Sequence, residues 1–212
     1  MSGPPWDARF FEADPRFWPI APAARRFAEH RDWPAPEEHV APGVRFVTAK
    51  KPRRTDRRTT QRGVGYDARI TAGEVPTRAR SWHDFLNALV WATFPASKRA
   101  LHARQASAIQ ARAVEGTAGL PNARTREQDA LALWDEGGII VLEGPTGVLT
   151  LAFGHALYEG LVTRGPRATA SALAFGVDVL PARERAVALA DALVCERLGG
   201  EWLPELLLRR EF

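Results

Sequence analysis

Residues 77–91 read TRARSWHDFLNALVW and place ionisable and amide side chains between two tryptophans. Ser81 is followed three residues later by Asp84, which is the spacing of a capping box. In that motif each side chain accepts a hydrogen bond from a free backbone N–H of the first helical turn. The pattern predicts a helix that begins at about Trp82.

The expected helix has two different faces. At roughly 100° per residue, its apolar stripe holds Trp82, Phe85, Leu86 and Leu89. The other arc holds His83, Asp84, Asn87 and Trp91. A solvated face more often carries Lys, Glu and Gln, so the second arc indicates a cleft wall or a buried hydrogen-bonded cluster. In the second case Asp84 is only a cap, and the other polar residues are satisfied within the fold.

Size and composition favour one globular domain. The chain has 212 residues, of which 45% are hydrophobic and 25% are charged, and no apolar run reaches the about 18 residues of a membrane helix. The first residues lack the pattern of a secretory signal, and the single cysteine, Cys195, has no disulfide partner. We expect a cytoplasmic protein of bacterial type with no membrane contact.

The pattern along the chain predicts a mainly α-helical α+β fold with a small sheet or hairpin. Residues 1–43 are rich in proline and aromatic residues, and we expect them to form an arm packed on a single domain of residues 44–212, with one helix around 21–30. Short strands are expected at 44–48 and 66–70, and a buried strand at 139–142. Residues 148–153 either pair back on that strand as a hairpin, which we favour, or pass straight into the next helix. Further helices are expected at 82–94, 97–105, 129–136, from about 154, and at 181–198. Gly137 is expected to end the third of these in a left-handed conformation.

Several helical residues have side chains suited to catalysis. His155 and Glu159 are four apart, so an imidazole and a carboxylate can share a divalent ion or a hydrogen bond on one helix face. Asp129 falls in a first helical turn, where the helix dipole alone is enough to favour an acid. If these helices converge, His83 or His155 is the natural general base, with an acid that orients it or binds a metal. No nucleotide-binding fingerprint is present, and the sequence identifies no cofactor.

A basic segment supports a different function. Residues 50–62 read KKPRRTDRRTTQR, and arginine offers a planar fork of donors to phosphate groups. The alternative is a loop that its charge keeps solvated, since no aromatic residue is interleaved to stack a base. The arginines concerned are Arg53, Arg54, Arg57, Arg58 and Arg62.

Four motifs together resemble one family. They are WHDFLNALVW at 82–91, FPASK at 94–98, QDALALWDEGG at 128–138 and FGHALYE at 153–159. With looser matches they make residues 33–198 similar to the bacterial family DUF3025, a domain of unknown function. The resemblance implies which positions belong together and implies no reaction.

Three hypotheses follow. The first is an enzyme, hydrolytic in type, that acts on an anionic ligand, with a polar pocket of His83, Asp84, Asn87, Asp129, His155 and Glu159, and with Arg78 and Lys98 holding the anion. The second is a non-catalytic module that binds nucleic acid or phosphate through the five arginines. The third assigns every motif to fold specification.

Overall fold

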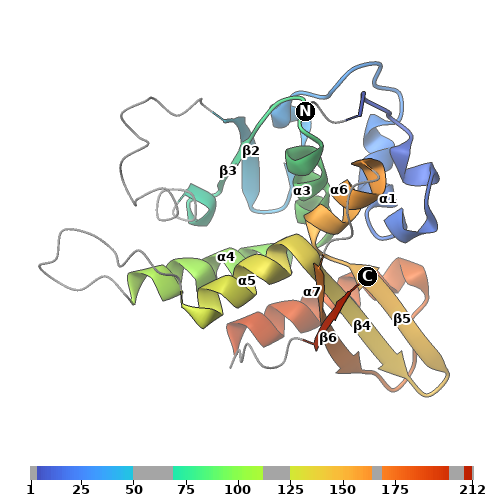
Figure 1. Ribbon diagram of the computed structural model, residues 1–212, viewed down its shortest axis with the longest axis vertical. Helices are drawn as coiled ribbons and strands as arrows, with labels where there is room; N and C mark the ends of the chain where they lie inside the picture. The colour runs from blue at the N-terminus through green and yellow to red at the C-terminus, as the bar shows by residue number, and fades with distance from the viewer. Residues whose placement is uncertain (1–3, 50–68, 112–124, 164–168, 201–207, 212) are drawn as a thin grey trace, which may run out of the picture.

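Two small sheets, with helices between and against them, make up the computed structural model (Figure 1). The structure describes residues 4–49, 69–111, 125–163, 169–200 and 208–211. Their mainly helical α+β architecture is the fold class expected from the sequence. None of the described helices has the length and apolarity needed to traverse a bilayer.

The N-terminal arm consists of short helical turns, because its prolines interrupt longer helices. The turns are η1 (Phe10–Glu12), η2 (Pro15–Phe17), α1 (Ala21–Ala24), η3 (Arg25–Phe27) and η4 (Pro36–Glu38). The helix expected over 21–30 is two short consecutive pieces, α1 and η3, with no proline between them. Phe10, Phe17, Ile20 and Phe27 are buried in the main hydrophobic core.

The first sheet has the strand order β1-β2-β3. β1 (Val40–Ala41) pairs antiparallel with β2 (Val44–Thr48), and β2 pairs parallel with β3 (Glu74–Thr77). The strand expected at 66–70 is wrong for Arg69 and Ile70, which are helical; its other residues lie outside the described part. β3 contains Pro76, which an edge strand tolerates because one side of its backbone needs no sheet partner.

β3 leads directly into the two central helices, α3 (Trp82–Thr93) and α4 (Pro95–Gln110). Phe94 separates them, as the Phe-Pro pair predicts. Only half of the expected capping box forms at the start of α3. Ser81 accepts from the backbone N–H of Asp84, but the Asp84 carboxylate bonds to Arg78 instead of returning to Ser81.

The second sheet has the order β5-β4-β6-β7. The predicted hairpin is present: β4 (Gly138–Gly144) pairs antiparallel with β5 (Gly147–Ala152). β4 also pairs parallel with β6 (Thr169–Gly176), a strand the sequence analysis missed, and β6 pairs with β7 (Leu208–Glu211).

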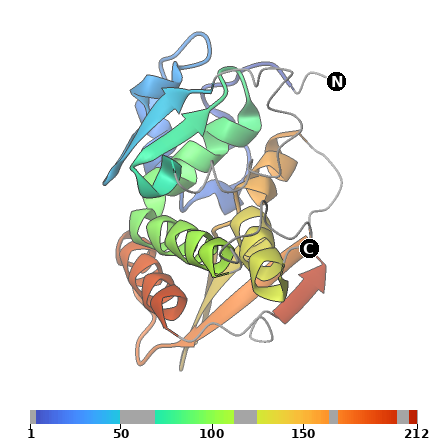
Figure 2. The same cartoon turned by 90° about the vertical axis from the view of Figure 1, so that its left-hand side faces the viewer.

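Helices α5 (Arg126–Gly137), α6 (His155–Thr163) and α7 (Arg183–Gly199) complete the fold. The capping box of Thr125 and Gln128 forms as predicted. The left-handed cap at Gly137 does not, because α5 passes straight into β4 with Gly138 already extended. α5 and α7 contact the second sheet, and α4 packs against both helices (Figure 2).

Candidate metal centre

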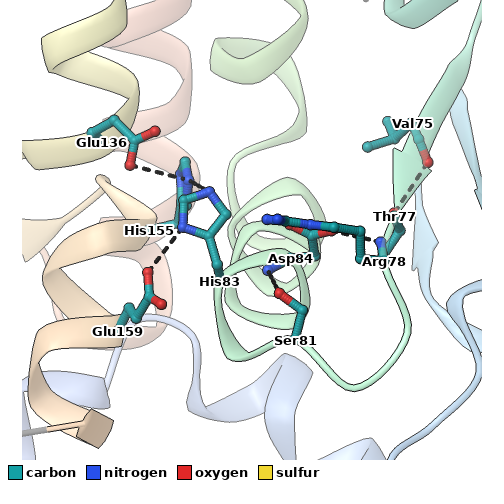
Figure 3. A network of polar contacts seen from close by, with 9 residues as sticks. All are labelled: Val75, Thr77, Arg78, Ser81, His83, Asp84, Glu136, His155 and Glu159. Carbon is teal, nitrogen blue, oxygen red and sulfur yellow. Dashed lines mark hydrogen bonds and ion pairs between the residues drawn. The ribbon is translucent and has the colours of Figure 1, made fainter. Parts of the chain in front are cut away.

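The start of α3, the end of α5 and the start of α6 meet at one point (Figure 3). His83 is the second residue of α3, Glu136 lies in the last turn of α5, and His155 is the first residue of α6. Glu159 follows His155 by one helical turn. Three segments distant in the sequence therefore contribute to one polar cluster.

The two imidazoles face each other directly. Their Nε2 atoms are 3.0 Å apart, and the rings are nearly perpendicular, with centroids 4.4 Å apart. His83 Nδ1 lies 2.9 Å from Glu159 Oε2, and His155 Nε2 lies 3.4 Å from Glu136 Oε2. The four side chains form a continuous chain of contacts.

These contacts determine where the ring protons sit. A carboxylate only accepts, so His83 Nδ1 carries the proton shared with Glu159, and in the neutral ring Nε2 has a free lone pair. Burial lowers the pKa of His155 to about 3, so this ring is neutral near pH 7. With the His83 proton on Nδ1, the 3.0 Å contact is a hydrogen bond from His155 Nε2–H to the Nε2 lone pair of His83.

The far side of His155 is enclosed. The ring is 2% exposed, and its Nδ1 has no hydrogen-bond partner of normal geometry among the described residues. The backbone of Asp135 lies close enough to raise the pKa of this ring. If Nε2 held a cation, Nδ1 would carry the ring proton and that backbone would be its nearby acceptor.

Negative charge predominates around the cluster. The carboxylates of Asp135, Glu136 and Glu159 converge there, and Lys98 pairs with Asp135. Burial raises the pKa of Glu136, and His83 opposes this; repulsion from Asp135 and Glu159 also raises it, whereas Lys98 lowers it. A cation at this point would be attracted by the converging carboxylates.

The donor set also fits such an ion. The nearest donor atoms of His83, Glu136 and His155 lie within 4.8 Å of one another. Tetrahedral zinc with bonds of about 2.0–2.1 Å places its ligand atoms about 3.3 Å apart, close to the 3.0 and 3.4 Å contacts of His155. Catalytic zinc sites typically have ligands of this kind: two histidine nitrogens and one carboxylate oxygen, with a second carboxylate that bonds to the other nitrogen of one histidine.

The family model of a protein of unknown function, DUF3025, matches residues 45–152, half of the chain. The chain belongs to the DUF3025 family. The match includes His83 and Glu136 and stops just before His155, so it is narrower than the resemblance over 33–198. No curated protein and no solved structure matches this DUF3025 chain.

The other proposed pocket residues of the DUF3025 protein lie apart from this cluster. Asp84 receives three hydrogen bonds from the backbone and guanidinium of Arg78. Asn87 accepts from Lys98 behind the site. Asp129 is exposed near the start of α5, about 10 Å along the helix from Glu136.

The two residues expected to hold an anion differ in access. Arg78 is 65% exposed in the connection between β3 and α3, where it bonds to Asp84 (Figure 3). Lys98 has no exposed surface and already contacts two protein oxygens, so it is enclosed away from any ligand. The five arginines of the basic segment lie outside the described residues.

Glu136 is the member of the cluster that sequence reasoning passed over. It stands beside Gly137 and Gly138, where a solvated acid at a helix end is the ordinary interpretation. The usable signal was its place in the family motif QDALALWDEGG, together with the direct passage of that segment into a buried strand.

Proposed function

We propose that this DUF3025 protein is a metal-dependent cytoplasmic enzyme of hydrolytic type that acts on an anionic substrate. His83, Glu136 and His155 bind one divalent transition-metal ion, and Glu159 orients His83. The convergence of the two imidazoles and the Glu136 carboxylate on one point supports this proposal most directly.

The donor types favour zinc over magnesium or calcium. Imidazole nitrogen suits zinc, cobalt and nickel, whereas the hard cations Mg²⁺ and Ca²⁺ prefer oxygen ligands throughout. Three protein ligands leave a fourth position for water, and zinc lowers the pKa of that water to about 7. The side chain of Glu136 is 51% exposed, so solvent and substrate can reach this side of the centre.

One residue near α3, Arg78, supports the proposal that the substrate is an anion. Arg78 is positioned by Asp84, which holds it in a fixed orientation beside the start of α3. Arginine donors recognise carboxylate and phosphate groups. Arg78 would therefore supply a cationic group for an anionic substrate in the connection that leads into α3.

Zinc titration of chelator-treated protein tests the metal centre. We expect one ion per chain, and loss of binding in His83→Ala and His155→Asn while circular dichroism keeps the helical signal. Glu159→Gln is expected to weaken zinc binding by about 10- to 100-fold, as loss of an outer partner does. Asp84→Asn is the matched control, because Asp84 is adjacent to His83 in sequence but bonds away from the cluster.

Hydrolysis assays test the enzyme separately. The zinc-loaded protein is expected to cleave the anionic ester bis-p-nitrophenyl phosphate, and to lose that activity with a chelator or with His83→Ala. Zinc affinity equal in wild type and His155→Asn would overturn the metal centre. If the His83→Ala and His155→Asn variants lost only stability, the cluster would serve the fold alone.

A further inference from the structure

A fully buried cation lies directly behind the proposed metal centre. Lys98, from the first turns of α4, is 0% exposed. Its Nζ donates to Asp135 Oδ1 at 2.5 Å and to Asn87 Oδ1 at 2.9 Å, and it lies 5.5 Å from the ring centre of Trp91. We call Asn87, Lys98 and Asp135 the lysine network.

The lysine network joins the turns that carry the metal ligands. Asn87 follows His83 by four residues, so the two lie one turn apart on α3. Asp135 immediately precedes Glu136, and its backbone lies against His155. Any change in how Lys98 holds α3 to the end of α5 therefore changes the separation of His83 and Glu136.

The energetics of buried ion pairs favour a role beyond stability. A buried pair adds little net stability over well-packed apolar residues, because desolvation of both charges offsets their attraction. Here Lys98 pairs with Asp135 near the end of α5 and also donates to Asn87 on α3. The network therefore fixes Asp135, the residue directly before Glu136.

We propose that Lys98 is a positioning residue of the metal centre: through Asn87 and Asp135 it sets the spacing and orientation of His83, Glu136 and His155. This inference rests on the proposed metal site and assigns no contact between Lys98 and the ion or substrate.

The test replaces the ion pair with apolar residues of similar size. Lys98→Met/Asp135→Leu removes both charges and so leaves neither one buried without its partner. The matched control is Arg104→Met/Glu127→Leu, because this pair, at 2.6 Å, also joins α4 to α5 but near the opposite end of α5. Asn87→Ala is a milder variant that keeps the ion pair and removes only one acceptor.

Co²⁺ is the probe, because its visible absorption reports ligand geometry, which a purely structural role would not alter. We expect Lys98→Met/Asp135→Leu to bind Co²⁺ about 10- to 100-fold more weakly than wild type, with an altered spectrum. Asn87→Ala is expected to show a weaker effect in the same direction, and the control pair none.

Wild-type affinity and spectrum in both lysine-network variants would overturn the positioning role while leaving the metal centre intact. Should the double variant fail to fold, the same result for Asn87→Ala alone would overturn it. Absence of Co²⁺ binding by the wild-type protein would instead overturn the proposed function, and this inference with it.

Discussion

Gly154 controls how closely α6 approaches the end of α5, and Gly154→Ala is the sharpest perturbation of the site that leaves its ligands unchanged. A Cβ at this position would lie 2.3 Å from the carbonyl oxygen of Glu136 and 2.5 Å from the nitrogen of Gly137. Both are backbone atoms, so no side-chain rotation relieves the clash. The two segments must separate by about 1 Å to reach van der Waals contact.

The separation affects both stability and metal binding. Overpacking of this kind lowers the free energy of unfolding by about 1–3 kcal/mol, and the two backbone contacts favour the upper end. About 3 kcal/mol corresponds to a melting temperature lower by about 6–12 °C in a chain of this size. Because Glu136 and His155 flank the contact, zinc affinity should fall by about 10- to 100-fold.

Calorimetry for the melting temperature and zinc titration for affinity measure the two effects. Gly160→Ala is the matched control: Gly160 lies within α6, which begins directly after Gly154, and its Cβ would meet nothing within 4 Å. Alanine in a helix stabilises by about 1 kcal/mol over glycine. Wild-type melting and zinc affinity in Gly154→Ala would refute the reasoning, because the close approach would then impose no constraint on the site.

Three further predictions concern other parts of the chain. Burial lowers the pKa of His39 to about 4. Below about pH 6.5 the unfolded chain therefore binds this proton before the folded chain does, and the free energy of unfolding decreases toward pH 4. In urea titrations, the free energy of unfolding of wild type should fall by about 2 kcal/mol more between pH 7 and pH 5 than that of His39→Leu, and equal decreases would contradict this. Asp84→Asn should lower the free energy of unfolding by about 1–2 kcal/mol, since it weakens the bonds from Arg78, yet leave zinc affinity unchanged in calorimetric titration; a large loss of affinity would place Asp84 in the centre. Alanine at Arg53, Arg54, Arg57, Arg58 and Arg62 should leave zinc affinity unchanged; DNA or RNA binding that falls steeply with salt in wild type alone would favour the alternative function.

Local signals in the sequence predicted much of the fold. The Phe94-Pro95 pair places the boundary between two helices, and Thr125 with Gln128 forms the expected box at the start of a third. The hairpin of β4 and β5 follows from a buried apolar run and a Gly-rich turn. Each of these depends on residues close together in the chain.

Elements defined by distant contacts were missed. β6 is rich in alanine and has little β-branched character, and it is a strand because it lies between β4 and β7. β3 contains a proline and pairs with a strand about 30 residues earlier. Pairing partners of this kind supply the hydrogen bonds that local propensity does not indicate.

In the candidate site, too, local sequence signals predicted some residues, and others are defined by distant contacts. His83, His155 and Glu159 stood out as functional side chains in helical context, and the structure brings them together. Glu136 joins them because Gly154 lets the start of α6 approach the end of α5 closely. Lys98 is buried because α4 packs against α3 and α5. The spacing of residues along the chain predicts neither contact.

Diffraction from zinc-soaked crystals at the zinc absorption edge is the decisive measurement for the metal centre. We expect one anomalous peak per chain, about 2.0–2.2 Å from Nε2 of His83, Nε2 of His155 and a carboxylate oxygen of Glu136. A map with no peak between these residues, at zinc concentrations that saturate the protein in solution, would contradict it.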